Sequence, residues 1–221
     1  MPMIGPNAGG SIIAWWRDRA RVRPTERLTA NNRQLTSLTG VLLVPLLGLV
    51  FLTGLALDAY WHVHYVVGFV LIPVVALKVA TTGYRAISYY VGHGPYRAAG
   101  PPELSLRLLA PLVVTSTIVA LVTGVVLWAQ HSRGGTLSTL HTDAAVICAG
   151  TVGIHLLAYV PRAITESFHA IRAGWSRMGS IRIAVVIVVV IAGIALSIIT
   201  YANGTWPARD QRPFGTPQRQ G

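Results

Sequence analysis

The side chains of this sequence best suited to chemistry are histidines inside otherwise apolar stretches. His141 and His155 are fourteen positions apart in the apolar stretch 140–162. Fourteen residues make almost four turns of an α-helix, so both imidazoles leave the same face, about 21 Å apart along the axis. In a hydrocarbon core about 30 Å thick, this spacing places one histidine near each boundary. Ionisable side chains at that depth are costly and usually functional, and imidazole is a common metal ligand.

An internal repeat supplies a counterpart for each of these histidines. Residues 35–85 align with residues 105–162, the second segment being longer in the connection between its two helices. His64 then aligns with His141, and Lys78 aligns with His155. On the preceding stretches, small residues align at the same two depths: Gly54 with Gly124, and Gly40 with Ala110. Two helical hairpins of one design are expected to pack as a four-helix bundle, with facing side chains around a buried cofactor.

The predicted outer layer of this bundle combines two imidazoles with two glycines. His64 and His141 come from parallel helices at one depth and can hold an iron from both sides, while Gly54 and Gly124 leave room for a flat macrocycle. Haem fits this set because its iron takes axial imidazoles, whereas zinc needs three or four converging protein ligands. The pattern predicts one haem and leaves open whether the bundle holds a second. The alternative is that these histidines only form hydrogen bonds across helices.

The predicted inner layer contains Gly40, Lys78, Ala110 and His155, and its chemistry stays open between three interpretations. In the first, the stem of Lys78 runs along the helix so that its charge reaches the cytoplasmic interface. In the second, a neutral Lys78 ligates an inner haem opposite His155 or bonds a haem propionate. In the third, the two side chains form a quinone or proton site, where they bind a carbonyl oxygen.

Five apolar stretches are long enough to hold these residues in a membrane. The predicted spans are 35–57, 62–83, 108–130, 140–161 and 181–201, and each reaches about the 20 residues that a crossing helix needs. The composition agrees, because 52% of the residues are hydrophobic and only 11% are charged, against about a quarter charged in soluble domains. We therefore expect an all-α membrane protein, a four-helix haem-binding bundle over 34–165 with a fifth transmembrane helix.

The charge pattern predicts how the chain crosses the membrane. The sequence has 18 basic and 7 acidic residues, a net charge of +11. Arginines gather in three segments, 1–33, 84–107 and 162–182, as the positive-inside rule requires of cytoplasmic segments. The N-terminus is thus predicted to be cytoplasmic, with an interfacial helix before residue 33, and 166–201 to hold a cytoplasmic loop and the fifth helix. The tail 202–221 is predicted to be extracytoplasmic, with the protein in the cell membrane.

The same composition argues against nucleic-acid binding and against covalently attached haem. The basic residues alternate with apolar spans, so nucleic acid is not an expected partner. The single cysteine, Cys148, allows no intramolecular disulfide and no CxxCH attachment of haem. A bound haem would therefore be held without covalent attachment, as haem b.

Short features of the bundle resemble a known family. The gap of thirteen residues between His141 and His155, with Gly40 and Gly54 fourteen apart on a neighbouring helix, resembles the diheme cytochrome b fold of respiratory bc complexes. The arrangement is also similar to cytochrome b subunits of membrane-bound dehydrogenases, and LKVATTGYR (77–85) looks like a small bacterial group of cytochrome b-type membrane proteins. The resemblance covers roughly residues 33–165.

That resemblance implies specific roles for the site residues. His64 and His141 would ligate an outer haem b, and His155 would belong to an inner site, where Lys78 stands in place of the family's histidine. The implied function is electron transfer between an extracytoplasmic redox partner, such as a molybdenum enzyme subunit, and the quinone pool or a second haem. The protein would then be a subunit of an oxidoreductase.

Two other function classes remain as alternatives. A small proton, ion or solute transporter could use Lys78 and His155 as titrating groups within the membrane. A cofactor-free anchor subunit would need no ligands at all. Colour separates these classes, because only a cytochrome has a reducible haem spectrum.

Overall fold

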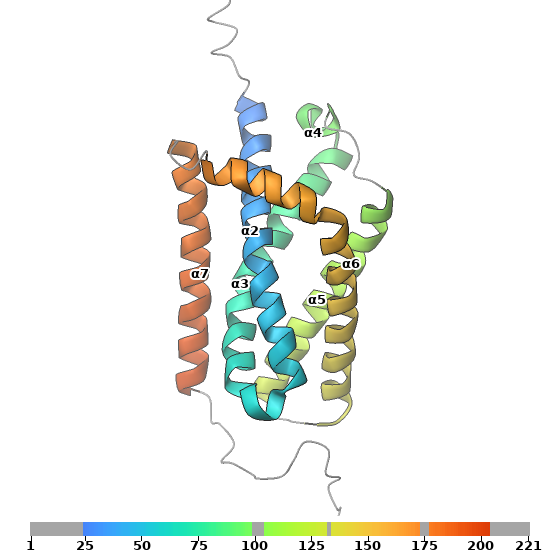
Figure 1. The fold of residues 1–221 in the computed structure, drawn as a ribbon, viewed down its shortest axis with the longest axis vertical. Helices are drawn as coiled ribbons and strands as arrows, with labels where there is room; N and C mark the ends of the chain where they lie inside the picture. Colours follow the sequence, from blue (N-terminus) through green and yellow to red (C-terminus); the bar gives the residue numbers. More distant parts are fainter. Residues whose placement is uncertain (1–23, 99–103, 132–133, 173–176, 204–221) are drawn as a thin grey trace, which may run out of the picture.

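The chain folds entirely into helices within the part that the structure describes. The structure is a computed structural model, and it describes residues 24–98, 104–131, 134–172 and 177–203. Its helices are α2 (Pro24–Leu55), α3 (Leu57–Tyr90), the short α4 (Gly94–Ala98), α5 (Leu104–Ala129), α6 (Thr136–Arg172) and α7 (Arg177–Asn203) (Figure 1). Five of them are long and apolar enough to cross a membrane. The protein is therefore an all-α, multi-pass membrane protein, as predicted.

The apolar spans lie close to their predicted positions. They are Thr29–Leu55, Leu57–Tyr90, Leu108–Ala129, Thr136–Leu157 and Ser180–Ala202. The predicted interfacial helix, to the extent that it falls before residue 24, and the tail from residue 204 lie outside the described residues.

Two segments predicted as loops are helical. Residues 58–61, between the first two predicted spans, belong to the first turns of α3, where Tyr60 has non-helical backbone angles (φ −123°, ψ 23°) and marks a kink. Helix α6 continues to Arg172, beyond the predicted loop start at 162. Its last part turns away from the bundle axis and crosses in front of α2 (Figure 1). Pro161 lies in this helix, and proline is a usual cause of a sharp helix bend.

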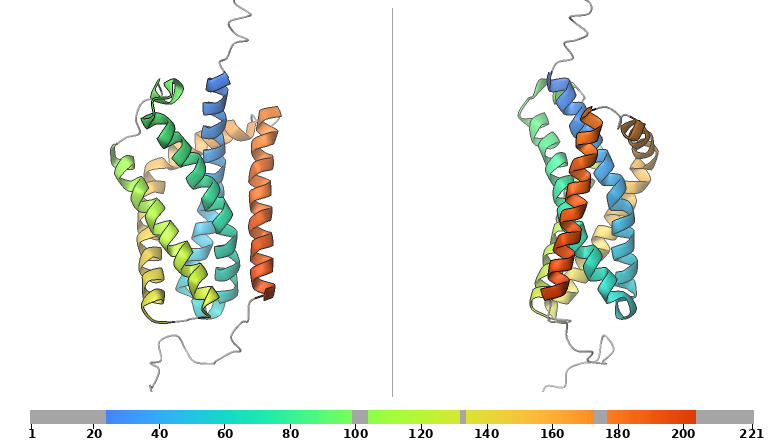
Figure 2. Two further views of the ribbon diagram at one scale, coloured as in Figure 1. Left: turned by 180° about the vertical axis from the view of Figure 1, so that it is seen from behind. Right: turned by 90° about the vertical axis from the view of Figure 1, so that its left-hand side faces the viewer.

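Both helical hairpins turn at the same end of the molecule, which we call the hairpin end. Helices α2 and α3 are joined there through Ala56, and α5 and α6 through residues 130–135 (Figures 1 and 2). The second connection is longer and uses Gly135 with a positive φ of 81°. Helices α3 and α6 therefore both start at the hairpin end and run in the same direction. Their early residues lie at one depth of the bundle.

The packed core lies between α2 and α3 and is closed by α7. Its buried members are Leu43, Val67, Leu71, Val74 and Val75. Buried hydroxyls next to it are satisfied within their own helices: Thr39, for example, donates to the carbonyl of Leu35 at 3.0 Å. In lipid such pairing is required, because no water is available to a buried polar group.

Helix α7 is fixed to the bundle at two points. Gly193 packs directly on α3, where an added Cβ would lie 2.8 Å from the carbonyl oxygen of Val70 and 3.2 Å from Cγ of Pro73. Near the other end of α7, the buried Arg182 donates to Oδ1 of Asn31 at 2.6 Å. A small residue thus permits close backbone contact, as is typical of helix pairs in membranes.

Substituting Gly193 by alanine is therefore expected to loosen α7. The new methyl group meets backbone atoms of α3 that cannot move alone, and such overpacking costs about 1–3 kcal/mol. Thermal unfolding of the purified protein in detergent, followed by circular dichroism, measures the loss. Gly48→Ala is the matched control, since nothing lies within 4 Å of a Cβ at Gly48. Equal stability of the two variants would contradict the close contact.

Candidate functional site

The two histidines predicted to share one depth lie next to each other. His64 is on α3 and His141 on α6, and their ring centroids are 6.2 Å apart with an angle of 87° between the ring planes. Both side chains are half-buried. The parallel direction of α3 and α6 produces this pairing, because it places residues close to both helix starts at the hairpin end.

Each imidazole is held by a hydrogen bond from Nδ1 to a backbone carbonyl of the neighbouring helix. His64 Nδ1 lies 3.0 Å from the carbonyl oxygen of Val50, and His141 Nδ1 lies 2.9 Å from that of Ala120. A carbonyl oxygen only accepts, so Nδ1 carries the proton in both rings. In the neutral imidazole, Nε2 is then the nitrogen with a free lone pair, and this is the atom that can bind a metal.

A threonine accompanies each of these carbonyl contacts. The hydroxyl oxygen of Thr53 lies 3.4 Å from His64 Nδ1, and that of Thr123 lies 3.1 Å from His141 Nδ1. Each hydroxyl also donates to the carbonyl four residues earlier in its own helix, as threonine commonly does in a helix. The two hairpins therefore have the same local arrangement. The segments that repeat in the sequence also repeat these hydrogen-bond contacts.

The glycines aligned in the sequence lie against these imidazoles. A Cβ at Gly54 would be 3.2 Å from Cε1 of His64, and a Cβ at Gly124 would be 3.1 Å from Cε1 of His141. We predicted that these glycines make room for a macrocycle, whereas the contact observed is with the edge of the imidazole. The absence of a side chain allows the ring to approach the helix closely enough to reach its carbonyl.

The spacing of the two rings fits one metal ion between them. An imidazole nitrogen lies about 2.0–2.1 Å from a bound metal and about 1.1 Å from its own ring centroid, so two imidazoles on opposite sides of a metal have centroids about 6.3 Å apart. The observed 6.2 Å agrees with this value. Among the described residues, no group of three or more His, Cys, Asp and Glu side chains could hold a metal. A haem iron needs only two axial ligands from the protein.

The inner layer is arranged differently. Lys78 reaches from α3 to α2, where Nζ donates to the carbonyl oxygen of Thr36 at 2.6 Å and lies 2.9 Å from the position of a Cβ at Gly40. Thr36 is buried. The ammonium therefore bonds inside the bundle, which does not agree with the interpretation that Lys78 extends to the interface. His155 on α6 is half-buried and within electrostatic range of Lys78, and Ala110 on α5 is half-buried.

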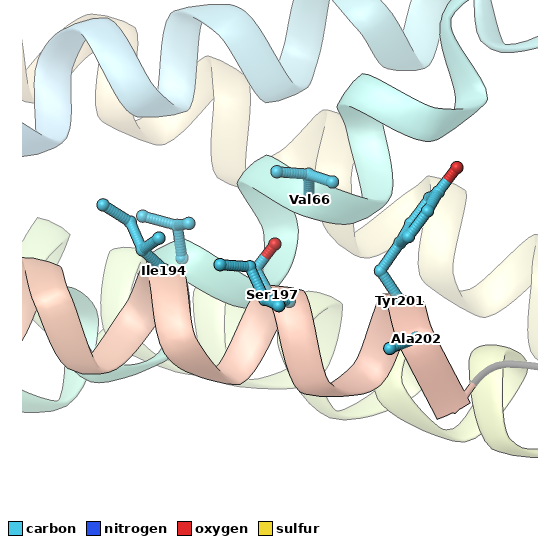
Figure 3. A pocket seen from close by; sticks show the side chains of 7 residues that line it. Val66, Ile194, Ser197, Tyr201 and Ala202 are labelled. Carbon is cyan, nitrogen blue, oxygen red and sulfur yellow. The ribbon is translucent and has the colours of Figure 1, made fainter.

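A groove that sequence reasoning missed lies between α3 and α7. It has a volume of about 310 Å³, and its walls are apolar, formed by Val66, Val70, Ile194 and Ile198. Figure 3 shows Tyr201 extending from α7 at one end of the groove. Its hydroxyl lies 3.3 Å from Nδ1 of His62, whose ring stacks on that of Trp61. No sequence signal pairs α7 with α3, because α7 has no counterpart in the repeat.

The site residues thus come from both hairpins, and each ring is positioned by the helix that precedes its own. The aligned small residues and the backbone carbonyls beneath them determine where the side chains can bond. Comparison of the chain with protein-family models, curated proteins and solved structures finds no match.

Proposed function

We propose that this protein is a b-type cytochrome of the membrane, in which His64 and His141 ligate the iron of one haem b. The observation that carries the proposal is the distance of 6.2 Å between the two imidazole centroids, with both Nδ1 atoms bonded to backbone carbonyls. The haem would supply one-electron chemistry. The protein would supply two oriented ligands and an apolar surrounding.

The chain's own residues act here by positioning. The carbonyls of Val50 and Ala120 accept the Nδ1 protons, which fixes the tautomer and the rotation of each ring. Such a hydrogen bond also makes the second nitrogen a stronger ligand. Gly54 and Gly124 allow the approach. Because all of these groups belong to helices, both ligands are held before the cofactor binds, and little conformational entropy is lost on binding.

The physiological role we propose is electron relay at the hairpin end of the bundle, which the arginine pattern assigns to the extracytoplasmic side in the cell membrane. The resemblance to cytochrome b subunits supports a separate oxidoreductase subunit as one partner, such as a molybdenum enzyme. The quinone pool is the proposed second partner. The apolar groove between α3 and α7 supports this choice, because its walls suit the apolar part of a quinone and the hydroxyl of Tyr201 lies at one end of it.

The test is the absorption spectrum of the full chain, purified in detergent after expression with sufficient haem. We expect a reducible b-type spectrum with about one haem per chain, and reduction by an added short-chain quinol. Colourless protein with a helical circular dichroism spectrum would overturn the proposal and favour a transporter or an anchor subunit. If dithionite reduced the haem but quinols did not, the assignment as a cytochrome would stand. The quinone pool would then no longer be its proposed partner.

A further inference from the structure

Three side chains of this bundle obey one contact rule. His64 bonds the carbonyl of Val50, four residues before Gly54, and His141 bonds that of Ala120, four residues before Gly124. In a helix, the side chain at one position covers the turn before it, including the carbonyl four residues earlier. A glycine therefore uncovers that carbonyl for a donor on the neighbouring helix.

Lys78 follows the same rule in the inner layer. Its Nζ donates to the carbonyl of Thr36, four residues before Gly40, and lies 2.9 Å from the position of a Cβ on that glycine. Lys78 is fourteen positions after His64 on α3, as His155 is fourteen after His141 on α6. The inner layer thus repeats the outer one, with lysine at the place where the repeat has histidine.

The difference between the two side chains lies in the number of nitrogens. An imidazole has two, so that one can donate to the carbonyl while the other offers a lone pair. Lysine has a single nitrogen, and in Lys78 it occupies the donor position over Gly40. Nζ of Lys78 therefore takes the place of Nδ1, the histidine atom that bonds the carbonyl. Lysine has no second nitrogen that could bind a metal.

The charge of Lys78 also opposes a cationic metal in this layer. Asp58 and Asp143 are the acidic side chains that the structure describes, and both lie near the hairpin end, far along the helices from Lys78. A carbonyl oxygen is the hydrogen-bond partner of the ammonium. The inner layer therefore lacks one ligand, and the side chain in its place is a lysine whose nitrogen already bonds a carbonyl.

From this geometry we infer that the inner layer is a second haem position that Lys78 keeps closed, and that a histidine at residue 78 would open it, with His155 as the other ligand. The inference rests on the proposed function and adds to it. The wild-type chain would hold a single haem near the hairpin end. In its inner layer, the hydrogen bond from Lys78 to Thr36 would join α3 to α2 where a cofactor would otherwise lie.

The experiment is the haem-to-polypeptide ratio of the purified full chain, together with a redox titration. We expect about one haem in the wild type and about two in Lys78→His, with a second midpoint potential. Lys78→Met removes the charge without adding a ligand, and it is expected to stay at one haem. In the double variant Lys78→His with His155→Ala, the ratio is expected to return to one.

The outcomes separate this inference from the proposed function. Two haems in the wild type would overturn the inference, because the inner layer would then accept a cofactor with lysine present. So would one haem in Lys78→His with an unchanged outer spectrum, since that spectrum shows that the variant is folded. No haem in any variant would instead overturn the cytochrome itself.

Discussion

Alanine at either His64 or His141 is expected to leave the purified protein without haem. In the proposed site each histidine is one of the two protein ligands of the iron, and each ring is already oriented by its bond to a carbonyl. Changing a residue that only orients a ligand costs about 10–100-fold in metal affinity. Loss of the ligand itself should exceed that range, and haem per chain measures it directly.

The matched controls for this prediction are two further histidines of the same helices. His62→Ala removes the ring that contacts Tyr201, and His155→Ala removes the inner-layer imidazole. Both variants are expected to keep the wild-type ratio of haem to protein. Retention of haem in both His64→Ala and His141→Ala would show that the iron is held elsewhere.

Valine in place of Gly54 or Gly124 is the second change with a large expected effect. A Cβ alone would lie 3.1 to 3.2 Å from the imidazole Cε1, and the two further methyl groups of valine require more room than the ring can give. The imidazole must then give up its hydrogen bond to the carbonyl. Without that bond the ring can rotate, and either ring nitrogen can carry the proton. We expect haem affinity to fall by about 10–100-fold, the usual cost of losing such an orienting bond.

Haem titration of the unloaded protein measures this loss, and Gly48→Val is the control on the same helix as Gly54. Nothing lies within 4 Å of a Cβ at Gly48, so this variant carries the cost of a β-branched residue in a helix without touching a histidine. If Gly54→Val and Gly48→Val bound haem equally tightly, the contact between glycine and imidazole would have no part in binding.

The spans and the depth of the histidines could be predicted from the sequence because both depend on local patterns. A run of about 20 apolar residues identifies a crossing helix, and a separation of fourteen places two side chains on one face. The internal repeat then paired His64 with His141. All three signals are present within single helices or between two similar segments of the chain.

The hydrogen bonds of the site could not be predicted in the same way. The bond from Lys78 to Thr36 depends on the approach of α2 to α3, and on which carbonyl Gly40 uncovers. The groove depends on α7, whose side chains carry no pattern that selects α3 as a neighbour. The extension of α6 to Arg172 was missed because its last turns are polar, and hydropathy finds only the apolar part of a helix.

The position of the histidine pair has a consequence for energy coupling. His64 lies within two turns of the start of α3, and His141 within two turns of the start of α6. If the pair holds a haem iron, as proposed, an electron that moves between the nearby surface and that iron crosses little of the insulating layer. The transmembrane voltage is worth about 2.3 kcal/mol per charge and 100 mV over the full thickness, so it acts on such an electron only weakly. Turnover confined to this end would be nearly electroneutral and would build no proton-motive force by charge separation.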